Sequence, residues 1–157
     1  MRRNGVTRFY CRVHEVEHLR PAPDIEALNI ARVGAGIVAY QGCWIWIGSV
    51  NGSHYGTLVP EGGNHAEWLA HRVVWNLLME GHGPWLELDH RTCKQRACVN
   101  PLHLEPVTRS ENERRKHGPA DRTWINQGAA ESSRVREFAQ ACGLPLPTCD
   151  LGIRLVA

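Results

Sequence analysis

Three residues of types that commonly bind metals, Cys93, Cys98 and His103, lie close together in a stretch with little sign of regular secondary structure. Four residues separate Cys93 from Cys98, and four more separate Cys98 from His103. The segment from His90 to Val107 shows little periodicity, and an irregular stretch of that length inside a compact domain needs an external organiser. Thiolate and imidazole ligands suit Zn²⁺ better than Mg²⁺ or Ca²⁺. The spacing therefore predicts a zinc-bound loop, in which chelation replaces a local hydrophobic core.

A tetrahedral zinc ion needs a fourth ligand from outside this loop. Cys43, at the start of a predicted strand, is the candidate. The alternative interpretation is a buried pair of free thiols beside a surface histidine. The sequence contains six cysteines and nine histidines, and clustered cysteines in a reducing compartment are more often metal ligands than disulfides. We therefore favour the zinc site, with Cys43, Cys93, Cys98 and His103 as its ligands.

The composition is that of an ordinary water-soluble globular domain. Hydrophobic residues make up 43% of the chain and charged residues 22%. No apolar run approaches the roughly 20 residues that cross a bilayer, and the basic N-terminus lacks the apolar segment of a signal peptide. These features predict a cytoplasmic protein with no membrane partner, and the length predicts one domain with short appendages.

Basic residues are unevenly distributed along the chain. The net charge of +2 is too small to indicate nucleic-acid binding by itself. Arginines gather within residues 1–20, and arginine and lysine gather again within residues 109–116. Two local basic segments suit contacts with phosphates, although a basic surface helix is often only solvated.

Hydrophobic periodicity and turn residues predict an α+β fold. Strands are expected over 43–48, 54–59, 65–69 and 86–89, and helices over 25–33, 70–80, 108–117 and 131–142. The first two strands would form a hairpin around the turn at 49–53. Thr108 and Glu111 fit a capping box at the start of the third helix. Five tryptophans are expected to lie mainly in the core: Trp44, Trp46, Trp68, Trp75 and Trp85.

A second group of polar residues combines Asp89 and His90 at a predicted strand end with Asn112 near a helix start. Hydrolysis of a phosphodiester needs a base to activate water and a cation to bind the phosphate. A neutral imidazole suits the first task, and carboxylate and amide oxygens suit Mg²⁺. On composition alone the simpler interpretation is strong, because an Asp-His pair is common and an asparagine in a first helical turn is usually solvated.

The string LDHRTCKQRACVNPLHLEPVTRSENERR, residues 88–115, resembles the core of phage-type HNH (His-Me finger) endonucleases, and zinc-binding homing endonucleases in particular. That core runs from a DH pair through C-x4-C and NP-x-HL to an EN on a helix. Upstream, GCWIWIG, HYG and AHRVVWNLL resemble the family's W-x-W-x-G hairpin and AHR helix. The similarity covers about residues 42–116, nearly half of the chain, and its elements follow the family's order.

The resemblance implies a ββα-metal core with an N-terminal antiparallel hairpin, a preceding helix and a structural zinc loop. It implies that His90 is the general base and that Asp89 and Asn112 bind a catalytic Mg²⁺ or Mn²⁺. Residues 41–118 would form the HNH domain. Residues 1–40 would be an N-terminal extension, and residues 119–157 a helical tail with an accessory contact to DNA.

Further residues take their expected roles from the same resemblance. Asn100 occupies the middle place of the H-N-H signature and is interpreted as a loop-pinning residue, which would also help to orient His90. His71 and Arg72 match the AHR motif, with His71 assigned a structural role. Contacts with nucleic acid are expected from Arg72, Arg91, Lys94, Arg96, Arg109, Arg114 and Arg115. The sequence departs from many members in one respect, since both Arg91 and Thr92 stand between the base histidine and the first cysteine. A bulge would absorb the extra residue.

The function expected from this sequence is metal-dependent hydrolysis of DNA, by nicking or by double-strand cleavage. Double-stranded DNA is the expected partner, and the expected setting is the cytoplasm of a bacterial or phage-infected cell. The chain would act as a monomer or a homodimer. The alternative is a non-catalytic, zinc-stabilised DNA-binding module, in which the same fold grips phosphates and His90 has no chemical role.

Overall fold

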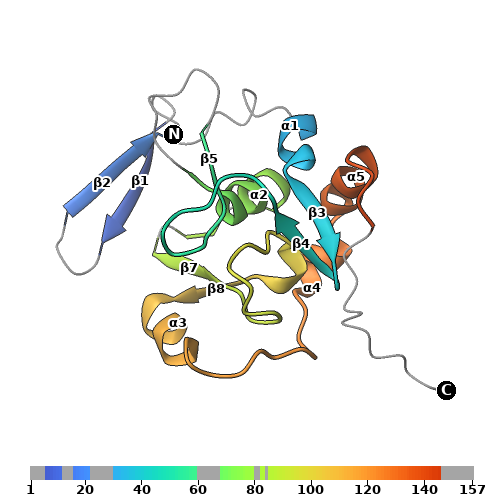
Figure 1. Ribbon diagram of the computed structural model, residues 1–157. Helices are drawn as coiled ribbons and strands as arrows, with labels where there is room; N and C mark the ends of the chain where they lie inside the picture. The colour runs from blue at the N-terminus through green and yellow to red at the C-terminus, as the bar shows by residue number, and fades with distance from the viewer. Residues whose placement is uncertain are drawn as a thin grey trace.

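The computed structural model is a mixed α and β fold with small antiparallel hairpins (Figure 1). It describes residues 30–59, 68–79, 82–83 and 85–145, together with the backbone of strands at 6–11 and 16–21. The strands are β1 (Val6–Cys11), β2 (Val16–Pro21), β3 (Ile37–Tyr40), β4 (Cys43–Trp46), β5 (Thr57–Leu58), β6 (Trp68–Leu69), β7 (Leu86–Asp89) and β8 (Glu105–Thr108). The helices are α1 (Ile30–Ala35), α2 (Ala70–Leu78), the 3₁₀ turn η1 (Pro101–His103), α3 (Arg109–Arg115), α4 (Gln127–Glu131) and α5 (Ser133–Ala141).

Each strand pairs with one neighbour in an antiparallel ladder: β1 with β2, β3 with β4, β5 with β6, and β7 with β8. Within the described residues, no helix has the length and apolar character needed to cross a membrane.

The hairpin of β7 and β8 runs directly into helix α3 (Figure 1). Its ladder places Leu86 opposite Thr108 and Asp89 opposite Glu105. Thr108 ends β8 and caps α3, because its side-chain oxygen accepts a hydrogen bond from the Glu111 backbone N–H at 3.3 Å. This is half of the predicted capping box, and such a cap typically contributes about 1 kcal/mol. Helix α3 then packs against both strands.

Strand β7 lies where the sequence predicts it, but β8 does not follow from the sequence. We expected an irregular stretch as far as Val107, and this is wrong at its end, since β8 begins at Glu105. Glutamate and proline are poor strand formers. The segment is extended because it pairs with β7, with Pro106 opposite Leu88, and tertiary pairing overrides the local preference.

The expected hairpin between residues 43–48 and 54–59 is also wrong. Strand β4 pairs with β3, a strand that the sequence did not indicate. The connecting residues Gln41 and Gly42 both have positive φ, at 48° and 77°, as the two-residue turns that match strand twist require. The segment after β4 returns through an isolated bridge between Val50 and Gly56, and β5 then pairs with β6.

The remaining predicted elements are present over shorter ranges. Helix α2 covers most of the predicted 70–80, and α5 most of 131–142, with the short α4 preceding it. The predicted strand 65–69 and helix 25–33 are seen as β6 and α1. Their first residues, 65–67 and 25–29, lie outside the described part of the chain.

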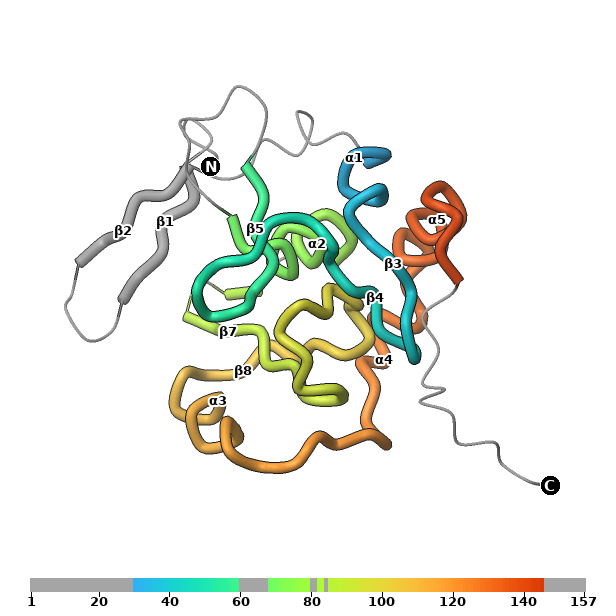
Figure 2. Tube along the Cα trace, viewed as in Figure 1, coloured from blue at the N-terminus to red at the C-terminus, as the bar shows by residue number. Residues whose placement is uncertain are grey.

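A single large core collects side chains from most of the described elements. Helices α1, α2 and α5 meet over the β3–β4 hairpin (Figures 1 and 2). Gly34 permits the close approach of α1 to α5, since a Cβ there would lie 2.2 Å from Cys142 Sγ. Val33 and Phe138 both belong to this core, so the described parts of both flanking segments contribute to it. Four of the five tryptophans are buried as expected, whereas Trp85 is 67% exposed.

Candidate metal centre and adjoining cleft

Three cysteines and one histidine converge beside strand β4 and can hold a metal ion. The ligand atoms of Cys43, Cys93, Cys98 and His103 all lie within 4.8 Å of one another. The Sγ atoms of Cys43 and Cys98 are each 3.6 Å from Nδ1 of His103. Zinc bonds of roughly 2.3 Å to sulfur and 2.0–2.1 Å to nitrogen imply an S···N separation of about 3.6 Å in a tetrahedron. Cys43 and Cys98 therefore already have the spacing from His103 that a tetrahedral zinc site requires.

Backbone hydrogen bonds hold the loop of residues 90–104 against β4 (Figure 2). Trp46 N donates to Ala97 O at 2.8 Å, and Val99 N donates to Trp44 O at 2.8 Å. An isolated bridge between Ile45 and Cys98 lies between these two bonds. Cys43 is thereby brought to the cysteines of the loop, although 50 or more positions separate them in the sequence.

Asn100 fastens the same loop through its carboxamide. Its Nδ2 donates to Gly42 O at 2.8 Å, and its Oδ1 accepts from Leu102 N at 3.0 Å. Both bonds involve backbone groups, and the side chain is fully buried. Asn100 forms none of the hydrogen bonds seen at His90, whose Nε2 is held by the Cys98 carbonyl, so Asn100 can orient that ring only through the loop it fastens.

The thiols of the cluster influence each other's ionisation strongly. Hydrogen bonds from Cys43 and Cys98 lower the pKa of Cys93. The hydrogen bond that Cys43 gives to Cys93 raises the pKa of Cys43 to about 12, and burial raises the pKa of Cys98 well above its ordinary value. Without a cation, only one thiolate is therefore favoured. A bound metal ion would supply the positive charge that three thiolates in a buried site require.

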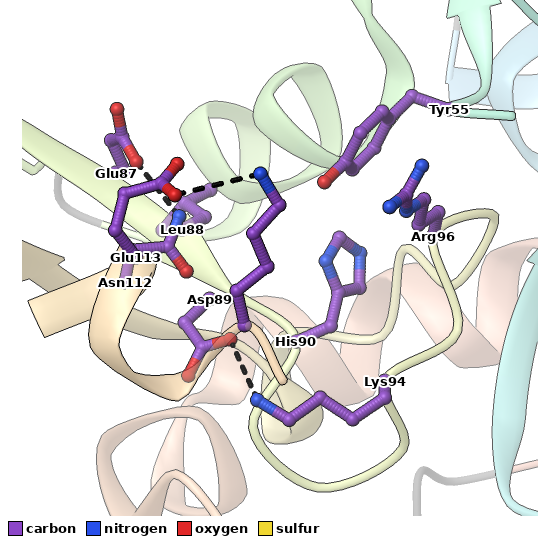
Figure 3. A pocket seen from close by; sticks show the side chains of 10 residues that line it. Tyr55, Glu87, Leu88, Asp89, His90, Lys94, Arg96, Asn112 and Glu113 are labelled. Carbon is purple, nitrogen blue, oxygen red and sulfur yellow. Dashed lines mark hydrogen bonds and ion pairs between the residues drawn. The ribbon is translucent and has the colours of Figure 1, made fainter. Parts of the chain in front are cut away.

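A cavity of about 290 Å³ adjoins this centre (Figure 3). The loop after β7, helix α3 and the segment before β5 all contribute to its wall. The lining residues are Tyr55, Glu87, Leu88, Asp89, His90, Lys94, Arg96, Asn112, Glu113 and Lys116. The three residues predicted for hydrolysis, Asp89, His90 and Asn112, thus face one space.

His90 lines the cavity with one ring nitrogen already occupied. Its Nε2 lies 2.9 Å from the backbone oxygen of Cys98. A carbonyl oxygen only accepts hydrogen bonds, so Nε2 carries the proton and the lone pair of the neutral ring is on Nδ1. Burial lowers the pKa of His90, against the opposing influence of Cys93 and the Cys98 carbonyl. The imidazole is therefore neutral at pH 7 and able to accept a proton.

Asp89 is buried at the end of β7, next to two cations. Lys94 Nζ lies 3.3 Å from its Oδ1, and Arg115 Nη1 lies 3.5 Å from its Oδ2. Oδ2 has no hydrogen-bond partner among the described residues. A buried carboxylate oxygen that accepts no hydrogen bond is a candidate ligand for a cation, which here would share the carboxylate with Arg115.

Asn112 projects from the first turn of α3 toward β7. Its Nδ2 donates to Oε2 of Glu87 at 2.7 Å. In Figure 3 the amide nitrogen is turned to Glu87, and the amide oxygen lies on the side of Asp89. Carboxylate and amide oxygens form a hard donor set that fits Mg²⁺ or Mn²⁺.

Five lining residues were not identified as site residues from the sequence: Tyr55, Glu87, Leu88, Glu113 and Lys116. Tyr55 packs its ring against His71 and His90, at centroid distances of 5.5 and 5.9 Å, and the two histidine rings meet edge-on at 5.0 Å. His71 is buried, and burial holds its pKa well below the ordinary value. The HYG and AHR motifs carry Tyr55 and His71, but neither motif indicates that these rings support His90.

The basic residues expected to contact nucleic acid fall into two groups. Lys94 and Arg96 line the cavity, where Arg96 also bonds Ser53 O and lies over the Tyr55 ring. Arg109 is exposed at the start of α3, and Arg72 is half-buried on α2. In the second group, each arginine forms ion pairs within the molecule: Arg91 with Glu105 and Asp121, Arg114 with Glu111, and Arg115 with Asp89, Glu105 and Glu111.

Comparison of the chain with protein-family models, with curated proteins and with solved structures found no match.

Proposed function

We propose that this chain is a metal-dependent DNA endonuclease of the HNH (His-Me finger) class, with β7, β8 and α3 as its ββα-metal core. The observation that carries the proposal is the shared cavity of Asp89, His90 and Asn112. Asp89 ends β7, His90 directly follows it and Asn112 lies in the first turn of α3, so the packing of α3 on the β7–β8 hairpin brings the three together.

His90 would act as the general base in this reaction. Its Nδ1 would take a proton from the water that attacks the phosphorus, while the Cys98 carbonyl holds Nε2–H and so fixes the tautomer. The ring is supported on its other side by His71 and Tyr55. A base held in one tautomer and one orientation needs little rearrangement to react.

Asp89 and Asn112 would hold one Mg²⁺ or Mn²⁺ through a carboxylate and an amide oxygen. When bound, such a cation stabilises the charge that develops on the phosphate and on the departing oxygen. Oδ2 of Asp89 accepts no hydrogen bond among the described residues, although Arg115 lies 3.5 Å away, and this oxygen and the orientation of the Asn112 amide both fit this role. Lys94, Arg96 and Lys116 line the same cavity and would attract the phosphate.

The cluster of Cys43, Cys93, Cys98 and His103 would bind a structural Zn²⁺, because its four donors leave no position open for water or substrate. Double-stranded DNA is the proposed substrate, and the cytoplasm of a bacterial or phage-infected cell is the proposed setting. Phosphate contacts carry no sequence information, so the proposal extends to phosphodiester cleavage and not to a target sequence.

Incubation of supercoiled plasmid with the protein in Mg²⁺, Mn²⁺ or EDTA tests the proposal. We expect nicked or linear DNA with either cation and none with EDTA. His90→Ala should slow cleavage by about 10²- to 10⁴-fold, as loss of a general base does, while DNA binding persists. His117→Ala, which removes an exposed imidazole outside the cavity, should cleave at the original rate.

The rival function is a non-catalytic, zinc-stabilised DNA-binding module. It predicts that the protein binds the plasmid but leaves it supercoiled under every metal condition. It also predicts that His90→Ala changes nothing beyond stability. A plasmid that stays supercoiled with every metal, or a cleavage rate that is unchanged in His90→Ala, would rule out the proposed nuclease mechanism.

A further inference from the structure

The side-chain amide of Asn112, a proposed metal ligand, is hydrogen-bonded to the carboxylate of Glu87. Asn112 Nδ2 donates to Glu87 Oε2 at 2.7 Å, and both residues line the cavity with Asp89. We propose that Glu87 is a positioning residue that fixes which end of the Asn112 amide faces the catalytic cation. This inference rests on the proposed function, because it takes Asn112 as a ligand.

The two ends of an asparagine amide are almost equal in shape and opposite in chemistry. The oxygen binds a hard cation, whereas the NH₂ group carries two donors and repels it. A half-turn of the amide would therefore replace a ligand with a repulsive group. An ionised carboxylate accepts hydrogen bonds and donates none, so Glu87 can pair only with the nitrogen. The oxygen is then left for the cation (Figure 3).

The position of Glu87 follows from strand geometry. Side chains two residues apart on a strand lie on the same face, so Glu87 and Asp89 of β7 both point to the side where α3 packs. One strand thus supplies a ligand, Asp89, and the group that orients the second ligand. The sequence alone does not indicate that Glu87 orients Asn112, because this role depends on the packing of α3 against β7.

Direct ligation of the cation by Glu87 is the competing role, and the two roles predict different chemistry. A ligand needs the negative charge of the carboxylate. An orienting group needs only an acceptor oxygen, which glutamine also has. The contrast between Glu87→Gln and Glu87→Ala therefore separates them.

The experiment measures Mn²⁺ affinity of the zinc-loaded full chain by titration, and the Mg²⁺ dependence of plasmid cleavage. Glu87→Ala should weaken Mn²⁺ binding and raise the Mg²⁺ requirement by about 10- to 100-fold, as loss of a group that orients a metal ligand does. Glu87→Gln should restore most of this loss. Glu137→Gln, at an exposed glutamate of α5 outside the cavity, should behave as the original protein.

A double variant sharpens the test. In Asn112→Asp both ends of the side chain are oxygens, so no orientation is needed, and adding Glu87→Ala should cause no further loss of Mn²⁺ affinity. Such non-additivity is the signature of residues that act through each other.

Two outcomes would overturn the positioning role: Glu87→Gln as damaging as Glu87→Ala, which indicates a ligand, or Glu87→Ala with unchanged Mn²⁺ affinity. Failure of the proposed function would look different, because the unmodified protein would then bind Mn²⁺ without cleaving DNA. The affinity measurements would still decide the role of Glu87 in that case.

Discussion

Cys98 belongs to the metal cluster through its sulfur and to the cleft through its backbone. Its Sγ lies 3.6 Å from His103 Nδ1, and its carbonyl oxygen lies 2.9 Å from His90 Nε2. The residue that completes the metal centre therefore also decides which nitrogen of His90 carries the proton. We therefore expect a change at the metal cluster to reach the cleft through this one residue.

The acid dependence of cleavage is the first prediction at this scale. His90 must be neutral to accept a proton, and burial lowers its pKa below 6.5. The cleavage rate should be constant just above pH 6.5 and fall only once the pH drops through the lowered pKa, by about tenfold per unit. Single-turnover cleavage measured against pH at saturating Mg²⁺ tests this.

The fall in cleavage rate at low pH, the acid limb of the profile, should be unchanged in His117→Ala. Circular dichroism at each pH would verify that the protein remains folded across the range. A limb centred above pH 6.5 would contradict the prediction, since it would mean that the base is charged near neutrality.

Single residues could be predicted where chemistry and spacing coincide. Cys93, Cys98 and His103 lie close in sequence, and the structure places them in one cluster with Cys43. Tyr55 and Glu87 could not be predicted, because their roles depend on which element packs over them. The alternation of β7 predicts that Glu87 shares a face with Asp89, but it does not predict that α3 covers that face.

At the scale of elements, Arg91 joins three segments. Its guanidinium bonds both carboxylate oxygens of Glu105 on β8, at 3.1 and 3.0 Å, and Asp121 Oδ2 at 3.0 Å. It also lies 4.8 Å from the centre of the Trp124 ring. The β7–β8 hairpin is thus connected to the segment leading to α4. We expect this internal role of Arg91 to replace the predicted contact with DNA.

Arg91→Ala should therefore lower stability and leave DNA binding unchanged. We expect a loss of about 1–2 kcal/mol from the ion pairs with Glu105 and Asp121 and the cation–π contact, seen as a lower urea midpoint. Arg109→Ala at the exposed start of α3 should do the opposite. It should keep the urea midpoint and reduce the salt dependence of DNA binding by about one phosphate contact.

Comparable weakening of DNA binding by both variants, with no change in the urea midpoint for Arg91→Ala, would contradict this assignment. Binding must be measured well below the unfolding transition of the less stable variant, so that a folding defect is not mistaken for lost contact.

Elements with strong local signals were predictable, and those created by pairing were not. Helix α2 shows apolar spacing along its length, α3 begins at a capping threonine, and β7 lies at the predicted residues. Strand β8 contains Glu105 and Pro106, and β3 follows a glycine-rich stretch. These two strands are extended because β8 forms backbone hydrogen bonds with β7, and β3 with β4. Such pairing between distant segments cannot be predicted from the local sequence.

At the scale of the whole molecule, the loop of residues 90–104 separates the main core from the cleft. Val99 and Leu102 of the loop join the core, while His90 at its start faces the cavity. The loop has only the short η1 turn as regular helix or strand structure. Its shape therefore depends on the four ligands, the Asn100 bonds and the two backbone bonds to β4.

Removal of the metal should consequently destabilise the molecule and disable the cleft together. Structural zinc in small domains binds with an apparent free energy of about 10–16 kcal/mol, comparable with the 5–15 kcal/mol that stabilise a typical domain. Even a loss of about 3 kcal/mol would lower Tm by roughly 6–12 °C in a chain of this size. We expect about one zinc per chain by elemental analysis, and a lower Tm with loss of Mg²⁺-dependent cleavage after chelation.

Matched cysteine variants separate the metal site from a general loss of thiols. Cys98→Ser should lose zinc, Tm and cleavage together, whereas Cys142→Ser, at a half-buried thiol outside the cluster, should keep its zinc and its activity. The backbone carbonyl of residue 98 holds His90, and we expect loss of zinc to displace that carbonyl. Cleavage should therefore fall in Cys98→Ser even at temperatures where the variant stays folded. Folded, active protein that contains no zinc would disprove the dependence of the cleft on the metal centre.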